Sequence, residues 1–218
     1  MIEFVKVTYT GREKETGRIF DTNDEKVAKE NNIYDAKFNY KPALMILGKN
    51  QLIKGFEEAL EKMKPGEEKI VEIPPEKAYG QRKASLVRLI PLQAFKKSKI
   101  DPKPGMILQL DGTPARVQSV SGGRVRVDFN HELAGKTLIF NIKLVEKIEK
   151  QEDKIKEIVK QVFPFEENPE IKIKEKDVEI KISKKSTAMQ DYQTRKMLLI
   201  NQIKNFAEMQ NIKIIEEY

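Results

Sequence analysis

The chain contains no cysteine and no tryptophan, and it has a single histidine, His131. Without cysteine it can form no disulfide, carry no catalytic thiol and bind no metal through thiolates. One histidine also excludes a histidine-rich metal site. Runs of apolar residues are short, and none approaches the roughly 20 residues that a membrane-spanning helix needs. These absences leave chemistry that needs neither a thiol nor a histidine-rich metal centre, in a protein expected to be soluble.

A secretion signal is absent from the first eleven residues, MIEFVKVTYTG, because charges stand where a signal peptide needs an apolar run. We therefore expect a cytoplasmic location. The 218 residues are enough for two to three small domains, and the 39% of hydrophobic residues fits a globular protein. Abundant lysine, glutamate and isoleucine favour a thermophilic source.

Charge is distributed unevenly along the chain. Residues 83–127 contain nine basic and two acidic residues, which gives this segment a net charge of +7. The complete chain also carries +7, so the remaining residues balance to zero. A step in charge of this kind marks a separate module with its own partners.

The most organised stretch is residues 47–80. Apolar residues recur every three to four positions over residues 53–63, which predicts a short helix with one buried face. Pro65-Gly66 ends this helix, and the alternation over residues 68–73 predicts a strand. A helix laid against a strand and rimmed by aromatic residues is a suitable floor for an apolar binding site.

Strands surround this stretch in the sequence. Residues 2–9 and 18–20 are predicted strands, and Thr10-Gly11 is expected to end the first of them. Residues 24–33 are predicted to form a short helix. The long alternating segment 137–148 needs an existing sheet to join, so the chain leaves a sheet, builds a second unit and returns.

The basic segment is that second unit. Its alternating apolar residues and its Asp-Gly and Ser-Gly-Gly turns predict a small all-β module. The predicted strands are residues 86–90, 106–110, 115–120 and 124–128.

A third unit begins at Gln151, with the predicted order α-β-β-α-β. Its helices are predicted at residues 151–163 and 187–210, and a hairpin is predicted at residues 170–183. The long helix is apolar on all sides at residues 197–200. A small domain covers only one face of a helix, so the second face is either a candidate dimer interface or is covered by the first helix.

Six motifs in this order resemble the FKBP-type peptidyl-prolyl cis/trans isomerases. They are VTYTG (7–11), IFDTN (19–23), LGKNQLIKGFEEAL (47–60), MKPGEE (63–68), PPEKAYG (74–80) and NHELAGKTLIFNIKLVE (130–146). More narrowly, the chain resembles the SlyD-like branch, in which a chaperone module, the insert-in-flap domain, interrupts the isomerase domain after AYG. The C-terminal extension resembles that of long archaeal members.

The resemblance implies an α+β chain of three domains. Residues 1–82 and 129–150 would form the isomerase domain, an FKBP-like antiparallel half-barrel wrapped on a short helix. Residues 83–128 would form the inserted all-β chaperone domain, and residues 151–218 a C-terminal α/β domain, which is also the domain with the candidate dimer interface.

The resemblance also implies site residues. Tyr79, Asp21 and Phe20 match catalytic positions, with Tyr79 as a hydroxyl donor. The backbone N–H of Ile53 would bind a carbonyl of the ligand. The implied substrate-binding residues are Tyr9, Leu52, Ile53, Phe56, Phe140 and His131.

The implied reaction rotates an X-Pro bond across a barrier of roughly 18–20 kcal/mol that amide resonance sets. The twisted transition state is less polar than the planar amide, so an apolar site favours it if the neighbouring carbonyls stay hydrogen-bonded. No bond is broken, and we therefore expect no metal and no cofactor.

Three departures from the family pattern stand out. Ala43 occupies a position that a larger residue often fills, and residues 24–38 insert a helix that reshapes the rim. The histidine-rich tail of some SlyD relatives is missing, so nickel binding is not carried over. Without the resemblance, Asp21 is a turn former and Tyr79 an exposed loop residue. Two roles stay open for Asp21, which are to orient Tyr9 or to act on the substrate carbonyl.

The insert admits three interpretations. As a chaperone module it would offer an apolar surface to unfolded, proline-containing chains, through Leu86, Leu89, Ile90, Phe95, Met106 and Leu108. As a nucleic-acid binder it would use its charge, but it lacks a pair of stacking aromatics, so we do not expect nucleic acid as a partner. As a plain loop it is too long. A non-enzymatic holdase or adaptor on an isomerase-like scaffold is the alternative to an enzyme.

Overall fold

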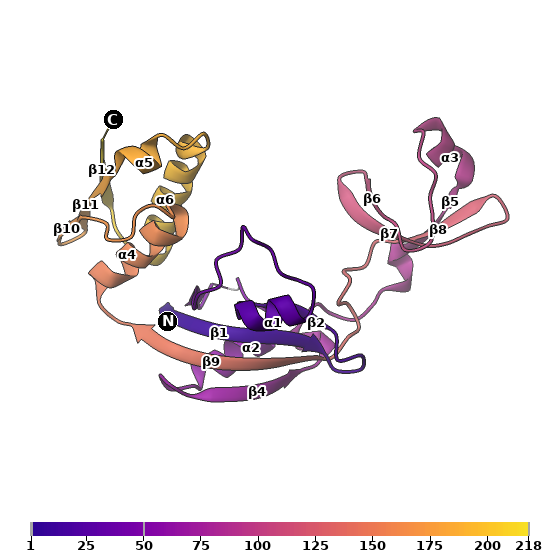
Figure 1. The fold of residues 1–218 in the computed structure, drawn as a ribbon, viewed down its shortest axis with the longest axis horizontal. Helices are drawn as coiled ribbons and strands as arrows, with labels where there is room; N and C mark the ends of the chain where they lie inside the picture. The colour runs from indigo at the N-terminus through magenta and orange to yellow at the C-terminus, as the bar shows by residue number, and fades with distance from the viewer. Residues whose placement is uncertain (1, 50, 218) are drawn as a thin grey trace. The chain divides into compact units, whose positions relative to one another are not determined.

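The computed structural model describes residues 2–49 and 51–217 and has a mixed α+β fold, as the sequence predicts. It divides into two compact units. The first holds the residues up to Arg12, residues 19–71 and the chain from Phe140 onward. The second holds residues 13–18 and 72–139. Figure 1 labels the helices and strands.

The largest sheet has five strands in the order β2-β1-β9-β4, with β3 also paired to β1. On one edge of β1, β3 pairs antiparallel along residues 3–7 and β2 along residues 10–12. The strands are β1 (Glu3–Glu13), β2 (Ile19–Thr22), β3 (Ala43–Leu47), β4 (Glu68–Ile73) and β9 (Leu138–Ile148). The segment between β2 and β3 contains helix α1 (Glu25–Glu30).

The expectation that Thr10-Gly11 ends the first strand is wrong. Strand β1 continues to Glu13, and its pairing with β2 shifts register between Gly11 and Arg12. A bulge of this kind keeps the strand extended while it bends, and glycine is a residue that often marks one. The strand therefore carries Gly11 into the sheet instead of turning away at it.

Helix α2 (Lys54–Glu61) lies between β3 and β4 in the chain and buries Phe56 and Leu60. The turn after it has Gly66 at φ 85°, a backbone conformation that glycine adopts without strain. The Gly66 N–H donates to the carbonyl oxygen of Leu144 on β9 at 2.7 Å. This bond ties the end of the helix to the sheet.

The second unit contains a four-stranded antiparallel sheet in the order β5-β8-β7-β6, as the hairpin signals predict. Its elements are β5 (Val87–Pro91), α3 (Leu92–Lys97), β6 (Ile107–Leu110), β7 (Thr113–Ser121) and β8 (Arg124–Asp128). Short 3₁₀ turns, η1 (Pro75–Lys77) and η2 (Ala84–Leu86), precede β5. The Asn130 side chain bonds both the N–H and the C=O of Lys83, at 2.8 and 3.0 Å, and so closes the base of the insert.

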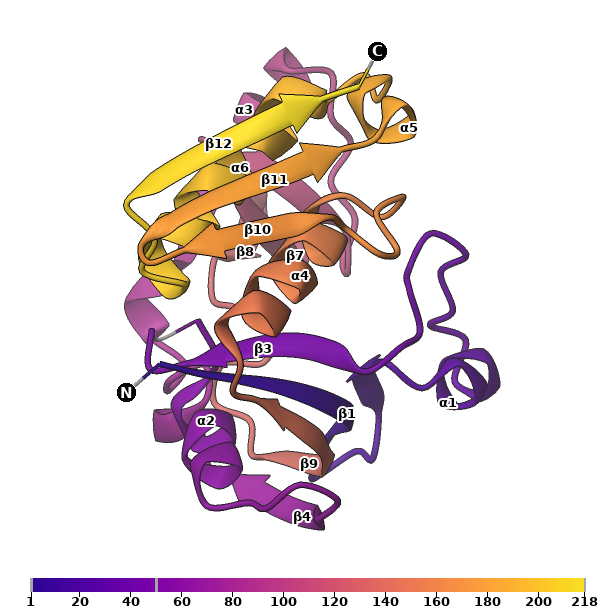
Figure 2. The same ribbon diagram turned by 90° about the vertical axis from the view of Figure 1, so that its left-hand side faces the viewer.

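The C-terminal part forms a three-stranded sheet, β10-β11-β12, backed by helices (Figure 2). Strands β10 and β11 are antiparallel, and β12 pairs parallel to β11. The elements are α4 (Gln151–Val162), β10 (Ile171–Lys174), β11 (Asp177–Ile182), α5 (Lys184–Thr187), α6 (Tyr192–Phe206) and β12 (Asn211–Glu216). An open hollow of about 690 Å³ is lined by β10–β12 and the end of α6 and contains none of the predicted site residues.

The single long helix expected over residues 187–210 is wrong, because α5 and α6 are separate. The hydroxyl oxygen of Thr187 lies within hydrogen-bond distance of the backbone oxygens of Lys184 and Glu217. Threonine and aspartate compete with helical hydrogen bonds in this way, which favours a break before Tyr192.

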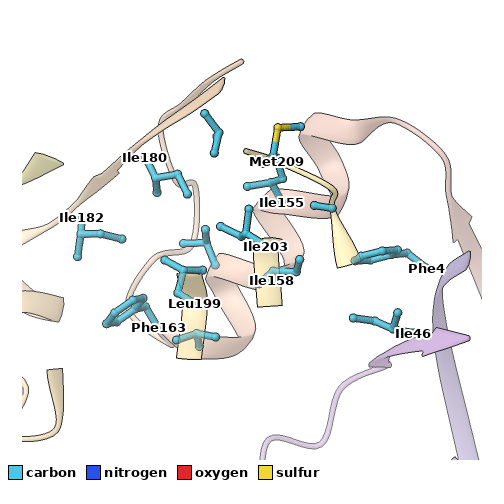
Figure 3. Packing of buried hydrophobic residues seen from close by; sticks show 14 of the residues in the cluster. Phe4, Ile46, Ile155, Ile158, Phe163, Ile180, Ile182, Leu199, Ile203 and Met209 are labelled. Atoms are coloured by element: carbon cyan, nitrogen blue, oxygen red, sulfur yellow. The ribbon is translucent and has the colours of Figure 1, made fainter. Parts of the chain in front are cut away.

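Helix α4 joins the C-terminal sheet to the five-stranded sheet of the same unit. Phe4 and Ile46 belong to the same buried cluster as Ile155 and Ile158 of α4 (Figure 3). The ammonium group of Lys154 lies 5.5 Å from the centre of the Phe4 ring. The C-terminal domain is therefore packed onto strands β1 and β3 through a continuous apolar core. None of the helices in the described part of the chain is long and apolar enough to cross a bilayer.

Candidate functional site

Three aromatic rings of the first unit pack around Phe140, and we call the four together the site rings (Tyr9, Phe20, Phe56 and Phe140). Phe56 and Phe20 meet Phe140 edge-on, at centroid distances of 5.0 and 5.6 Å. Tyr9 lies 6.4 Å from Phe140 and meets Phe56 edge-on at 5.8 Å. Phe56 and Phe140 are buried, whereas Tyr9 and Phe20 are partly open to solvent. The structure thus joins β1, β2, α2 and β9 in one ordered apolar surface.

Gly11 is required for this packing, and sequence reasoning missed it. A Cβ atom at Gly11 would lie 2.7 Å from Phe140 Cε1 and 2.8 Å from Phe20 Cζ. Such distances are too short for carbon atoms, so any larger residue would push the two rings apart. The glycine was interpreted as a strand breaker because a sequence shows no close approach between segments.

Asp21 bonds Tyr9, the residue that one of its two predicted roles concerns. The Tyr9 hydroxyl donates to Asp21 Oδ2 at 3.0 Å. Burial raises the pKa of Asp21, and hydrogen bonds from the Tyr9 side chain and the Thr22 backbone offset part of that rise. Asp21 as a whole residue is exposed, so its carboxylate is only partly removed from water beside the Tyr9 ring.

Asn23 is a second residue that sequence reasoning missed, since it was interpreted as part of a turn cluster. Its side chain is buried, accepts from the Tyr9 N–H at 2.7 Å, and donates to the carbonyl oxygens of Val7 and Lys41 at 2.8 and 3.1 Å. Its own N–H donates to the Tyr9 oxygen at 3.2 Å. Asn23 therefore holds the backbone of Tyr9 and both ends of the 24–42 segment together.

Leu52 and Ile53 precede α2 and are partly buried. Ile53 is the residue at the N-cap of α2, and its carbonyl oxygen accepts from Phe56 and Glu57 at 3.0 and 3.1 Å. Among the residues that the structure describes, the Ile53 N–H has no hydrogen-bond acceptor. An N–H in that state beside Phe56 can donate to a ligand carbonyl.

Tyr79 and His131 lie together in the second unit. Their rings stack at 4.0 Å with an angle of 4° between the planes. The Leu133 N–H donates to His131 Nδ1 at 3.1 Å, which fixes the orientation of the imidazole ring. The imidazole ring of His131 therefore supports the Tyr79 ring by stacking on it. The sequence alone does not predict this stacking, because 52 positions separate the two residues.

Ion pairs hold the loop that carries His131. Glu13 is buried and pairs with Arg18 and Lys136 at 2.7 and 2.9 Å. Burial raises the pKa of Glu13, but hydrogen bonds from Lys136, Arg18 and Thr16 outweigh it, so the pKa lies below its ordinary value. Glu132 also pairs with Arg18.

The predicted chaperone residues of the insert divide into two groups. Leu89 is 61% exposed and Met106 40% exposed, and Leu86 and Ile90 are partly buried. The prediction that Phe95 and Leu108 face solvent is wrong, because both lie in the core of the small sheet. A sheet this small has few large apolar side chains to form a core, so Phe95 is needed inside it. Ile107, which was not predicted, is 60% exposed.

No group of three or more histidine, aspartate or glutamate side chains within residues 2–49 and 51–217 is placed to hold a metal ion. The site rings thus present an apolar surface with one carboxylate and one backbone donor. This arrangement suits the binding of a ligand and the stabilisation of a form of it that is less polar. The site rings offer no nucleophile.

Comparisons with known proteins show which family the chain is similar to. Residues 88–133 match the family model of the FKBP26 IF domain, and residues 151–218 match that of the FKBP26 C-terminal domain. The short-type peptidyl-prolyl cis-trans isomerase of Methanocaldococcus jannaschii is 46% identical over 142 residues, which are 65% of this chain and 89% of that protein.

Bacterial relatives are more distant. A probable FKBP-type 16 kDa isomerase of Pseudomonas fluorescens is 33% identical over 51% of this chain and 77% of its own length. The isomerase SlyD of Helicobacter pylori is 32% identical over 56% of this chain and 68% of its own length. With site rings drawn from four elements and relatives that align over most of their own lengths, the chain belongs to the FKBP-type peptidyl-prolyl cis-trans isomerases.

Proposed function

We propose that this chain catalyses the cis-trans isomerisation of X-Pro bonds in polypeptides at the site rings. The observation that carries this function is the packing of Tyr9, Phe20 and Phe56 around Phe140, with two rings buried and two open to solvent. Its FKBP-type relatives are named for this activity.

The residues act without covalent chemistry. The apolar rings favour the twisted X-Pro bond, which has lost amide resonance and is less polar than the planar bond. The Ile53 N–H donates to a substrate carbonyl. Tyr79, whose ring stacks on His131, is the second donor in this proposal because it matches the hydroxyl-donor position of the family motif PPEKAYG. Asp21 fixes the hydroxyl of Tyr9 and with it the position of the ring.

The direct test is isomerisation of a short X-Pro peptide by the intact chain, comparing the wild type with a Phe56→Ala, Tyr79→Ala double variant. The proposal expects catalysis by the wild type and its loss in the double variant. An Ile70→Ser variant, changed at an exposed residue of β4, serves as the matched control and retains activity. Equal activity in the wild type and the double variant would refute this assignment of the site.

The insert supplies a second part of the function, the binding of unfolded chains. Leu89, Met106 and Ile107 support this role, because exposed apolar side chains on a small basic sheet suit apolar segments of unfolded polypeptides. We assign residues 1–82 and 129–150 to the isomerase domain, residues 83–128 to the insert and residues 151–218 to the C-terminal domain. The family models that match residues 88–133 and 151–218 support this division.

The C-terminal domain forms a homodimer in this proposal. Helix α6 buries Leu199 but leaves Met197 and Leu198 exposed, so α4 does not cover that face. A second copy of the chain would bury it. Light scattering on the intact chain tests this, since a monomeric mass at working concentrations contradicts it and a Leu198→Glu variant is expected to lower the mass of a dimer.

A holdase without enzymatic activity is the competing function. Suppression of aggregation by the chain, with no acceleration of X-Pro exchange, would favour it over the proposal.

A further inference from the structure

Three aromatic side chains in the segment between β2 and β3 form an ordered cluster outside the site rings. We call them the loop aromatics (Tyr34, Phe38 and Tyr40). Tyr34 stacks on Tyr40 at 5.3 Å with an angle of 11°, and Phe38 meets Tyr40 edge-on at 4.9 Å. The ammonium group of Lys29 lies 4.9 Å from the centre of the Tyr34 ring.

Two of the three rings are exposed and Tyr40 is partly buried, so the cluster is not a small hydrophobic core. Tyr34 is 44% exposed and Phe38 45% exposed, and Ile33 beside them is also open to solvent. Hydrogen bonds shape the loop beneath them, since the Asp35 N–H donates to the Tyr40 hydroxyl at 2.9 Å and the Phe38 N–H donates to the Asp35 carbonyl oxygen at 3.0 Å. Rings held in position before binding lose little entropy when a ligand covers them.

The strand register places the root of this loop at Tyr9. Strand β3 occupies residues 3–7 of β1 and β2 occupies residues 10–12, so the chain between β2 and β3 leaves the sheet edge beside residues 8 and 9. Asn23 pins both ends of the loop there, through its bonds to the Tyr9 backbone and to the Lys41 oxygen. The loop aromatics are thus continuous with the strand that carries one of the site rings.

The net charge of the segment between β2 and β3 does not favour a charged ligand. Residues 24–42 contain four acidic and four basic residues, Asp24, Glu25, Glu30, Asp35, Lys26, Lys29, Lys37 and Lys41, so the segment is neutral. Exposed aromatic rings on a neutral loop favour contact with apolar or aromatic side chains.

We propose that the loop aromatics are a secondary subsite for the polypeptide substrate, which binds an apolar or aromatic side chain several residues away from the X-Pro bond. This inference rests on the proposed isomerase function and adds a preference that a minimal peptide cannot reveal. The occupant is a flanking segment of the same chain that is isomerised at the site rings.

The test uses the intact chain and two kinds of peptide. One is a tetrapeptide with a single X-Pro bond, and the other is a series of longer polar peptides with one phenylalanine placed at increasing distances on either side of the same bond. The measured quantity is kcat/KM of each long peptide divided by kcat/KM of the tetrapeptide. One window of spacing is expected to raise this ratio by about three- to tenfold, as an aromatic contact of ordinary strength would.

Variants then locate the effect. A Tyr34→Ser, Phe38→Ser double variant is expected to bring the ratio down to that of a peptide without phenylalanine, and Phe38→Tyr with Tyr34 retained is expected to keep the gain. Ile70→Ser, which removes an exposed apolar residue of the same unit, is the matched control and keeps it too. Because each ratio is taken within one variant, a loss of folded protein cancels.

The outcomes separate the two proposals. If the tetrapeptide is isomerised but no spacing of phenylalanine raises the ratio, or the double variant retains the gain, the subsite is refuted and the isomerase function stands. If neither peptide is isomerised, the proposed function fails and this inference fails with it.

Discussion

Phe140 is the residue on which the site rings depend, because it contacts Tyr9, Phe20 and Phe56. The sequence predicted all four of these residues as site residues, because each lies within one of the six motifs that resemble the family. The stacking of Tyr79 on His131 and the bonds of Asn23 were not predictable in this way. They depend on contacts between segments that are far apart in the chain, and a single sequence does not show those contacts.

A Gly11→Ala variant tests the close approach of the rings. The added methyl would overlap Phe140 and Phe20, and forcing a group into a packed site of this kind costs about 1–3 kcal/mol of unfolding free energy. We expect a lower Tm and a lower kcat/KM, because both rings must move. The neighbour Arg12 is exposed, and Arg12→Ala is the control, expected to stay within about 0.5 kcal/mol of the wild type. A Gly11→Ala protein as stable and active as the wild type would show that the rings do not meet at this residue.

The pKa of Glu13 predicts how stability depends on pH. Its folded pKa lies below its unfolded value, so the stabilisation is fully present above the ordinary glutamate pKa of about 4.3 and is lost as the pH falls through the folded pKa. Glu13→Gln should cost about 1–2 kcal/mol at neutral pH, since its ionic partners are partly exposed, and should flatten the acid side of the stability profile.

Urea unfolding across a pH series measures this, with the exposed neighbour Glu15→Gln as control. An identical acid loss in the wild type and Glu13→Gln would mean that other groups cause it.

Helix α6 shows both what periodicity predicts and what it omits. The apolar run at residues 197–200 correctly indicated an apolar helix, but the break before Tyr192 depends on local hydrogen bonds of Thr187 that compete with helical ones. In the same way, β1 was predicted as a strand but ended too early, because Gly11 has a packing role that its turn propensity conceals.

Two neighbouring leucines of α6 provide a matched pair of variants. Leu199 is fully buried, so Leu199→Ala should destabilise the C-terminal domain by about 2–5 kcal/mol through lost burial and a residual cavity. Leu198 is exposed, and Leu198→Ala should change the stability of a single chain little while weakening a dimer. Thermal unfolding at several protein concentrations distinguishes the two effects, and equal destabilisation by both variants at all concentrations would contradict this reading of the helix.

The complete chain divides its tasks if the insert binds clients and the site rings isomerise them. The Asn130 side chain bonds the backbone of Lys83, so the two ends of segment 84–129, which holds all of the insert except Lys83, lie close together. This segment is therefore replaceable by a short turn. The shortened chain is expected to isomerise short peptides as before but to accelerate proline-limited refolding of a whole protein much less. Equal losses in the two assays, or no loss in either, would refute the division.

The measurement closest to the central claim is the exchange rate of an X-Pro peptide between its cis and trans forms, followed by NMR with a trace of the intact chain. The peptide alone exchanges over tens of seconds or more. We predict that the wild-type chain accelerates the exchange and that the Phe56→Ala, Tyr79→Ala double variant does not. An exchange rate equal to that of the peptide alone, in the presence of the folded wild-type chain, would contradict the account.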